Sequence, residues 1–376
     1  MIKKLLVFLL LISACCINLV PRQIASANAV SSSASGMCVI DSASKRILYE
    51  HNKDKKLEMA STTKVVTAIT VLDNCKNLEE KIKVDNKAIG IEGTSIYLRK
   101  DEVISVKDLL YGLMLRSGND AATALAIHVG GSVDGFADLM NKTAKKVGAK
   151  NSNFKNPHGL HHAEHYTTAY DLAIITAYAL NNPVFEQIVS TKHYTISATN
   201  ASEKRYLTNK NKLLSTLEGC CGVKTGYTKN AGRCLVSACN RKDFKAVCVV
   251  LNCGPMFEES AQLLNSAYNE YNYAKIIDKN KEIYNEYMID ETNGKLYLYT
   301  NEDFYYPLKD NEFSKLKLKY QLDLDDAVEG EVVGQIQVYL YNCLIKTLKL
   351  YTMNKIDKLI DSNTLHIAEI MWEEVA

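Results

Sequence analysis

Residues 59–72, with the sequence MASTTKVVTAITVL, decide how the rest of the chain is interpreted. Apolar residues at positions 65, 66, 68, 69 and 72 follow the spacing of one helix face, so Ser61 is predicted at or near a helix N-terminus. Side chains three residues apart on a helix are neighbours, which places Lys64 beside Ser61. A serine hydroxyl is a weak nucleophile until a base removes its proton, and a neutral lysine can be that base. The free N–H groups of the helix end would favour a developing oxyanion.

The Ser-x-x-Lys spacing is not specific by itself. It also occurs at Ser42–Lys45, in a predicted turn, and at Ser314–Lys317, in an alternating strand pattern. Neither pair has the helical setting that brings the two side chains together. Taken alone, Ser61 fits an ordinary helix N-cap as well as a nucleophile, so its interpretation depends on motifs further along the chain.

Two such groups lie C-terminal to the Ser-x-x-Lys pair. Ser117-Gly118-Asn119 lies in the tight connection between helices predicted over 105–116 and 121–129, where side chains can be aimed into a cleft. Lys224-Thr225-Gly226 occurs once and is predicted to end a strand over 220–224. Taken alone, each is more simply a turn or a strand end. Together and in this order, the three groups match the signature of penicillin-binding proteins and class A β-lactamases.

These motifs give the chain a resemblance to one family. It resembles the low-molecular-mass penicillin-binding proteins, which are serine-type D-alanyl-D-alanine carboxypeptidases, over nearly its whole length. The resemblance implies an α/β (α+β) catalytic domain of the β-lactamase/transpeptidase type, with an antiparallel sheet flanked by helices, and a small C-terminal all-β domain. The family-like segments are Val39-Ile-Asp41, Ala60-Ser-Thr-Thr-Lys64, Leu115-Arg-Ser-Gly-Asn-Asp-Ala-Ala122, Asn156-Pro-His-Gly-Leu160, Tyr170-Asp-Leu-Ala173 and Gly222-Val-Lys-Thr-Gly-Tyr-Thr228.

The resemblance also implies a mechanism. Ser61 would attack the carbonyl of the penultimate D-alanine of a peptidoglycan stem peptide and form an acyl-enzyme, with Lys64 as the general base. A lysine is normally protonated at neutral pH, but burial and a nearby cation both favour its neutral form, and Lys224 would supply that cation. Ser117 would relay the proton to the leaving D-alanine, and Asn119 would hold amide groups of the substrate.

By the same resemblance, the third motif would bind the end of the substrate. Lys224 and Thr225 would hold the terminal carboxylate, and Gly226 would let the strand lie close to the peptide. The backbone N–H groups of Ser61 and Tyr227 would form the oxyanion hole. No metal or organic cofactor is needed, and β-lactam antibiotics are expected inhibitors. D,D-Endopeptidase activity on the same fold is an alternative.

Length and composition fit a globular protein of two domains. The chain has 376 residues, of which 47% are hydrophobic and 23% charged, with a net charge of +2. No cluster of Lys and Arg with interleaved aromatic residues occurs, which argues against nucleic-acid binding. We expect a signal peptide over 1–29, the catalytic domain over 30–275, a β-rich domain over 276–352 and an amphipathic tail over 353–376.

The two ends of the chain bear on its location. A basic start, an apolar run over 5–12 and small residues over 25–29 are typical of a secretory signal peptide. An uncleaved membrane anchor and a lipidated Cys15 are the alternatives. We therefore expect a protein secreted across the cytoplasmic membrane, in the cell wall or at the outer face of the membrane. The tail is acidic where such anchors are usually basic, so only weak peripheral membrane contact is expected.

Eleven cysteines are present, and six of them fall between residues 220 and 253. Their spacing is not the paired C-x-x-C of a zinc site. We favour small hydrophobic side chains in buried strands, with one disulfide as the main alternative.

Three other functions compete with a serine carboxypeptidase. His161-His162-Ala163-Glu164-His165 matches the H-x-x-E-H spacing of some zinc peptidases, but that motif needs a helix, and Pro157 and Gly159 favour a loop. A β-lactamase would need a base that releases the penicilloyl group, and Glu164 lies in the region where such a base occurs. A non-catalytic cell-wall binding protein would not require the intact serine, lysine and asparagine residues of the three motifs.

Overall fold

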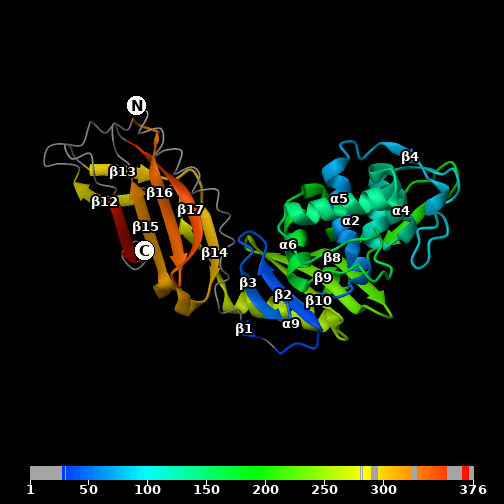
Figure 1. Ribbon diagram of the computed structural model, residues 1–376, viewed down its shortest axis with the longest axis horizontal. Coiled ribbons are helices and arrows are strands. Elements are labelled where there is room, and N and C mark those ends of the chain that lie inside the picture. Colours follow the sequence, from blue (N-terminus) through cyan, green and yellow to red (C-terminus); the bar gives the residue numbers. More distant parts are fainter. Residues whose placement is uncertain are drawn as a thin grey trace. The chain divides into compact units, whose positions relative to one another are not determined.

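The structure, a computed structural model, describes residues 28–29, 31–279, 281, 283–288, 295–322, 328–353 and 366–371 (Figure 1). The chain forms two compact units, one over Ala27–Glu270 and a second that contains Tyr271–Ala376. The expected signal peptide lies outside the described residues except for 28–29. The expected tail lies outside them except for 353 and 366–371.

A six-stranded sheet forms the middle layer of the first unit. Its strand order is β1-β3-β2-β10-β9-β8, and all neighbours are antiparallel except β1 and β3. The turn predicted at Ser42–Lys45 joins β2 and β3, which pair antiparallel. The strands are β1 (Asn28–Ala29), β2 (Gly36–Asp41), β3 (Ile47–His51), β8 (Cys220–Thr228), β9 (Gly232–Arg241) and β10 (Phe244–Leu251).

Helices cover both faces of this sheet, as Figure 1 shows. Helix α6 packs on β2 and β10 on one face, and α9 packs on β9 and β10 on the other. An antiparallel sheet flanked by helices is therefore the observed fold class. The helices are α2 (Lys64–Asn74), α3 (Val106–Leu115), α4 (Asn119–Gly130), α5 (Val133–Lys146), α6 (Ala169–Ala179), α7 (Pro183–Ser190), α8 (Leu213–Thr216) and α9 (Met256–Glu270).

Helix α2 lies at the centre of the helical layer. It contacts α3, α4, α5 and α6, and every residue from Lys64 to Val71 is buried. A helix that is apolar on all sides belongs in a protein interior, and here the one charged side chain of that stretch, Lys64, is buried with it. The sequence thus places an ionisable amine inside the core.

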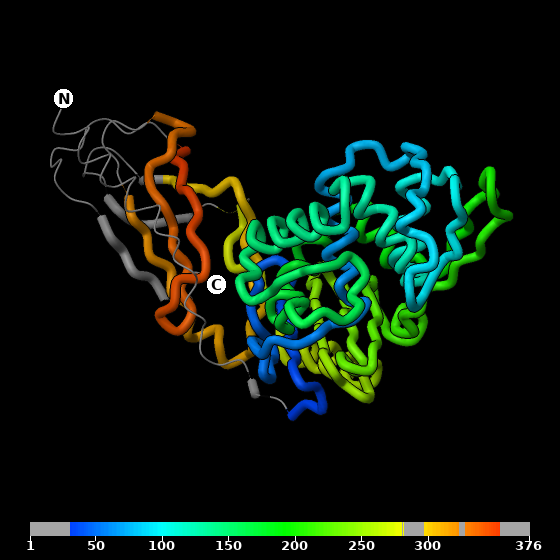
Figure 2. The backbone as a smooth tube through the Cα atoms, turned by 45° about the vertical axis from the view of Figure 1, so that its right-hand side comes forward, coloured from blue at the N-terminus to red at the C-terminus, as the bar shows by residue number. Residues whose placement is uncertain are grey.

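Two small hairpins lie at one edge of this unit. The loop between β4 (Lys81–Lys83) and β5 (Val103–Ser105) lies beside the β6–β7 hairpin (His193–Ile196 and Arg205–Thr208), as Figure 2 shows. The two segments are joined by an ion pair of 2.7 Å between the Arg205 guanidinium and the buried Glu102 carboxylate. This loop also includes the short 3-10 helix η2 (Asn86–Ala88).

The second unit is built from strands, as predicted. Side chains 316, 318, 320 and 322 are buried and alternate with half-exposed ones, which confirms one buried face. A six-stranded sheet of order β12-β13-β17-β16-β15-β18 shares its core with the β11–β14 pair. The elements are β11 (Asn272–Ile277), β12 (Ile283–Met288), β13 (Lys295–Tyr299), β14 (Phe304–Leu308), η3 (Asp310–Lys315), β15 (Leu316–Leu322), β16 (Val332–Leu340), β17 (Cys343–Thr352) and β18 (His366–Met371).

Part of the expected tail is a strand of this sheet. Residues His366–Met371 pair antiparallel with β15. Among the described residues, no helix is both long and apolar enough to span a bilayer.

The nine cysteines from Cys38 onward are all free thiols. Five are buried, among them Cys234, Cys239, Cys248 and Cys253 of the 220–253 group, while Cys220 and Cys221 are half-buried. The interpretation as small hydrophobic side chains in buried strands is therefore confirmed for Cys234, Cys239 and Cys248, which lie in β9 and β10, whereas Cys253 is buried just after β10. No disulfide joins any of the nine.

Candidate active site

Ser61 lies in the 3-10 turn η1 (Ala60–Thr63), directly before α2. The turn is held by its own threonines, because the Thr62 hydroxyl donates to the Met59 carbonyl at 2.6 Å and the Thr63 hydroxyl to the Ala60 carbonyl at 2.8 Å. The predicted contact is present: Ser61 Oγ lies 2.9 Å from Lys64 Nζ.

Lys64 Nζ has three acceptors around it. Besides Ser61 Oγ, it donates to Asn119 Oδ1 at 2.7 Å and to the backbone carbonyl of His158 at 2.8 Å. The Asn119 amide oxygen and the His158 carbonyl can only accept here. A neutral amine has two N–H donors and one lone pair, so two fixed acceptors turn that lone pair toward the Ser61 hydroxyl. The geometry therefore fits a base poised beside a nucleophile.

The environment of Lys64 favours this neutral form. Burial lowers the pKa of Lys64 well below its usual range, and the positive charges of Lys224 and Lys210 lower it further. The opposing effect of the Asp120 carboxylate is smaller. Lys224 was expected to act in this way, whereas Lys210 was not identified from the sequence.

Ser117 and Asn119 flank the start of α4, as predicted. Asn119 Nδ2 donates to the Glu92 carbonyl at 2.6 Å, which fixes the orientation of its amide and leaves Oδ1 for Lys64. Ser117 has a backbone φ of 65°, in the left-handed region. Its Oγ is buried and has no hydrogen-bond partner among the described residues. A buried, unpaired hydroxyl is costly, so this one calls for a functional explanation.

The Asp120 carboxylate anchors the loop over residues 95–98. Its carboxylate accepts from the backbone N–H groups of Ile96 and Leu98 at 3.0 Å each and from the Ser95 hydroxyl at 2.5 Å. The Asn119 backbone N–H donates to the Thr94 carbonyl at 2.7 Å. The start of α4 thereby sets the position of this loop.

The Lys224-Thr225-Gly226 motif lies within strand β8, which continues to Thr228. The expectation that it ends the strand is therefore wrong, because pairing with β9 continues through Thr228 opposite Gly232. A Cβ at Gly226 would lie 3.1 Å from Ser61 N and 3.0 Å from the Met59 carbonyl oxygen. Only glycine lets the strand pass this close to the η1 turn.

The other residues of the third motif differ in exposure. Lys224 is buried, and its Nζ donates to the Thr225 carbonyl at 3.0 Å. Burial, and then the charge of Lys210, lower the pKa of Lys224 to about 7. Thr225 is half-buried, while the Tyr227 side chain is 66% exposed. Tyr227 therefore offers the site its backbone and an open aromatic ring.

The segment Asn156–Leu160 supplies the carbonyl behind Lys64. Gly159 has a φ of 85°, and a Cβ there would lie 1.9 Å from the Ala60 carbonyl oxygen, so glycine is required. The segment is family-like in sequence, but its residue types alone indicate no role for His158. Any residue type can supply a backbone carbonyl, so the sequence could not indicate the contact of the His158 carbonyl with Lys64, and only the fold shows it.

The His161–His165 segment is a loop, not a helix. His165 is buried with both ring nitrogens engaged: Nδ1 accepts from the Lys155 backbone N–H at 3.0 Å, and Nε2 lies 2.9 Å from Thr63 Oγ1. His161 pairs instead with Glu58 at 2.8 Å. These histidines therefore do not converge on one point, and the zinc-peptidase alternative loses its geometric basis.

Comparisons with known proteins identify the family of the chain. Residues 22–254 match the D-alanyl-D-alanine carboxypeptidase family, and residues 271–358 match the C-terminal domain of penicillin-binding protein 5. The carboxypeptidase DacF of Bacillus subtilis is 34% identical over 245 residues, which are 63% of each chain. DacA of Haemophilus influenzae is 30% identical over 85% of this chain and 84% of its own length.

A solved structure extends the similarity to three dimensions. Penicillin-binding protein 5 from Haemophilus influenzae superposes with a TM-score of 0.71 at 26% identity, over 89% of this chain and all of that one. With the family match spanning more than half of the sequence, the chain is a member of the D-alanyl-D-alanine carboxypeptidase family.

Proposed function

We propose that this protein is a D-alanyl-D-alanine carboxypeptidase that removes the terminal D-alanine from peptidoglycan stem pentapeptides through a Ser61 acyl-enzyme. The observation that carries the proposal is the setting of Lys64. Two fixed acceptors and a lowered pKa leave its lone pair directed at Ser61 Oγ, 2.9 Å away.

The acylation step begins with this pair. Lys64 takes the Ser61 proton as Oγ attacks the carbonyl carbon of the penultimate D-alanine. The carbonyl oxygen becomes an oxyanion, which the backbone N–H groups of Ser61 and Tyr227 stabilise. The close approach of Gly226 to Ser61 N supports this role, because it places the next residue of β8 beside the η1 turn.

The leaving group must then receive a proton. Ser117, whose buried Oγ has no other hydrogen-bond partner in the described chain, relays the proton from Lys64 to the amide nitrogen of the terminal D-alanine. The C–N bond breaks, D-alanine leaves, and the ester to Ser61 remains. Water then attacks this ester, and Lys64 takes a proton from the water and passes it to the departing Ser61 Oγ. The ester bond breaks, and the shortened peptide leaves with a free carboxylate.

Positive charge around the site suits the substrate carboxylate. Lys224 and Thr225 bind it from strand β8, and Lys210 adds a further cation near Lys224. Asn119 completes the site by holding Lys64 and amide groups of the stem peptide. A β-lactam carries a carboxylate and a reactive amide in similar positions, so penicillin is expected to acylate Ser61.

The β-lactamase alternative gains no support from Glu164. Its carboxylate forms an ion pair of 3.2 Å with Lys155 and is 67% exposed. A base that activates a water for deacylation would be expected to be held toward Ser61, whereas this carboxylate is held by Lys155 and open to solvent. We therefore expect a long-lived penicilloyl-enzyme, and D,D-endopeptidase activity stays the alternative on the same site.

The same function accounts for the expected location. An enzyme acting on stem peptides works in the cell wall or at the outer face of the membrane, which fits the secretory pattern of residues 1–29. Weak peripheral membrane contact through the tail is part of the proposal and rests on its amphipathic sequence alone.

Mass spectrometry of the secreted form, residues 30–376, tests the proposal. After incubation with penicillin, we expect a stable adduct on Ser61, and release of D-alanine from an acylated Lys-D-Ala-D-Ala peptide. Ser61→Ala should lose both. Ser42→Ala is the matched control, because Ser42 belongs to a second Ser-x-x-Lys pair, located in the β2–β3 turn.

The outcomes are distinct. An adduct that forms and disappears within minutes would favour a β-lactamase. Folded protein that forms no adduct would contradict acyl transfer by Ser61.

A further inference from the structure

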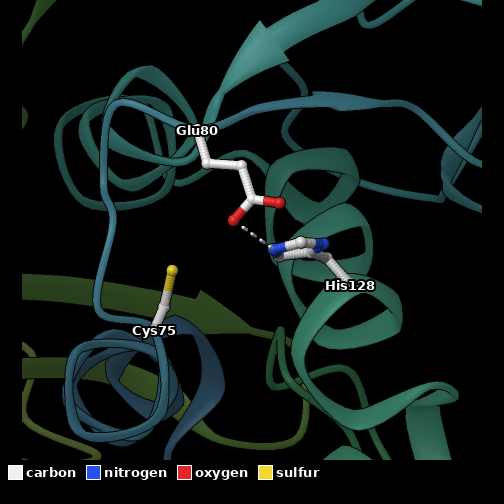
Figure 3. A group of neighbouring side chains, drawn as sticks. All are labelled: Cys75, Glu80 and His128. Carbon is white, nitrogen blue, oxygen red and sulfur yellow. Dashed lines mark ion pairs between the residues drawn. The ribbon is translucent and has the colours of Figure 1, made fainter.

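A second group of reactive side chains lies at the far end of the helices that carry the site. Cys75 follows the last residue of α2, Glu80 precedes β4, and His128 lies in the last turn of α4. One ligand atom from each, the thiol sulfur, a carboxylate oxygen and a ring nitrogen, lies within 4.8 Å of the other two. Figure 3 shows the three side chains pointing toward one common space.

This donor set matches the preferences of zinc. Thiolate, imidazole and carboxylate are the three protein ligands of Zn²⁺, at about 2.0–2.3 Å from the metal. Tetrahedral ligands at those distances are about 3.3–3.7 Å apart, and His128 Nε2 and Glu80 Oε2 are already 3.7 Å apart. Among the described residues, no other group of three or more such side chains comes this close together.

The backbone around the cluster is well held. Cys75 N donates to the Val71 carbonyl at 2.8 Å, which fixes the Cys75 backbone at the end of α2, and the thiol donates to the Asn77 carbonyl at 3.5 Å. Glu80 N donates to the Asn77 carbonyl at 3.3 Å, and the Glu80 carbonyl accepts from Val106 N at 3.0 Å. Only side-chain rotation is then needed to close the three ligands around an ion.

The charged side chains beside the cluster pair with each other and leave its ligand atoms free to bind a metal ion. The adjacent carboxylate, Glu79, pairs with Lys107 at 2.9 Å. Glu80 pairs instead with His128, so its ion-pair partner is a histidine and not a lysine or arginine. Glu79, a neighbouring carboxylate outside the cluster, therefore provides the control substitution for this site.

We propose that Cys75, Glu80 and His128 bind a divalent transition metal of the zinc type, with water in the fourth position. On binding, the Cys75 thiol releases its proton to solvent and coordinates as thiolate. Because α2 has 11 residues, the ion would sit about 16 Å along the helix from Lys64. Its role is to join the C-terminal ends of α2 and α4, whose N-terminal ends carry Lys64 and Asn119.

The proposal is independent of the catalytic one and is tested separately. Tag-free protein, residues 30–376, is stripped with a chelator and titrated with Zn²⁺ against a chromophoric chelator. We expect one equivalent bound, affinity at least tenfold weaker in Cys75→Ser and His128→Gln, and no change in Glu79→Gln or Cys343→Ser. Co²⁺ should give a thiolate-to-metal charge-transfer band that Cys75→Ser lacks.

A second readout measures the effect on the fold. Zn²⁺ should raise the melting temperature of the wild type, since a ligand that binds only the native state stabilises it, and should not do so in Cys75→Ser. Penicillin acylation should proceed with and without metal in every variant, which also shows that each variant is folded. Equal metal binding by wild type and Cys75→Ser, or no binding by either, would overturn the site and leave a surface His128–Glu80 pair.

Discussion

Lys64 Nζ lies 2.7 Å from Asn119 Oδ1, so the second motif directly holds the base of the first. The two residues are distant in sequence, and they meet because α2 and α4 begin at the same place. The contact makes Asn119 an orienting partner of Lys64, in addition to its proposed role as a substrate ligand.

Replacing this amide by a carboxylate should disable the base. In Asn119→Asp, a negative charge beside Lys64 would favour the ammonium and raise the pKa of Lys64. We expect penicillin acylation at pH 7 to fall about 10- to 1000-fold, with much of the loss recovered at higher pH. Asn119→Ala should be slower at every pH without moving the profile. Identical pH profiles in the two variants would contradict this role.

The charge of Lys210 should affect both the acid and the alkaline limb of the pH profile of kcat/KM. Its charge lowers the pKa of Lys64, which must be neutral to act, and of Lys224, whose pKa is about 7 and which must be charged to bind a carboxylate. Removing the charge in Lys210→Gln raises both pKa values, so the acid and alkaline limbs of kcat/KM both move to higher pH.

The test for Lys210 is whether the curves of kcat/KM against pH for wild type and Lys210→Gln cross. The variant should be slower than wild type at acid pH and faster at alkaline pH. Lys204→Gln, a change at another exposed lysine near the β6–β7 hairpin, should follow the wild-type profile. An unshifted profile for Lys210→Gln would show that this lysine does not influence the site.

His165 should make the catalytic unit less stable in acid. Burial lowers the pKa of His165 to about 4, against 6.5 in the unfolded chain. Between these values the unfolded state binds the extra proton, so the free energy of unfolding drops by about 3 kcal/mol as pH falls from 7 to 4. The pKa of half-buried His158, lowered to about 3, acts in the same direction.

The stability difference between wild type and His165→Gln isolates this contribution. It should be largest at pH 7 and shrink by about 3 kcal/mol toward pH 4. Urea unfolding followed by far-UV circular dichroism is suitable, because every α-helix of the described residues belongs to the first unit. A difference that stays constant with pH would refute the assignment, and exposed His193→Gln is the control.

Gly226→Ala should reduce the rate of acylation more than it reduces the stability of the fold. The new methyl group would lie 3.0–3.1 Å from backbone atoms of Met59, Ser61 and Thr62, which can yield only by shifting the η1 turn. A displaced nucleophile can cost about 100-fold in rate, whereas overpacking costs about 1–3 kcal/mol of stability. Gly254→Ala, with nothing within 4 Å, should behave as wild type. Normal acylation by Gly226→Ala would mean that the strand is less tightly placed than the structure indicates.

The sequence predicted most of the site because its signals are local. The Ser61–Lys64 contact follows from helix spacing, and the chain order of the three motifs identified the family. Lys210 and the His158 carbonyl were missed because they act only through tertiary contact. The position of Lys224-Thr225-Gly226 inside β8 was also missed, since strand ends depend on pairing with β9.

The fold was predictable to a similar degree. Periodicity located the β2–β3 hairpin and the β-rich second unit. Helix α7 was not predicted, although Asn182 caps it and Pro183 occupies its first turn, both ordinary start signals. The β6–β7 hairpin was also not identified, and its position depends on a distant partner, Glu102.

The free cysteines of the chain bear on how the protein can be made. No step in reaching the native state of the described residues requires an oxidant or a disulfide isomerase, since all nine thiols from Cys38 onward are unpaired. Non-covalent contacts alone hold the described residues in the fold, so exposure to reductant should leave the enzyme native. Folding of the described residues is thus independent of the redox state of the compartment in which it takes place.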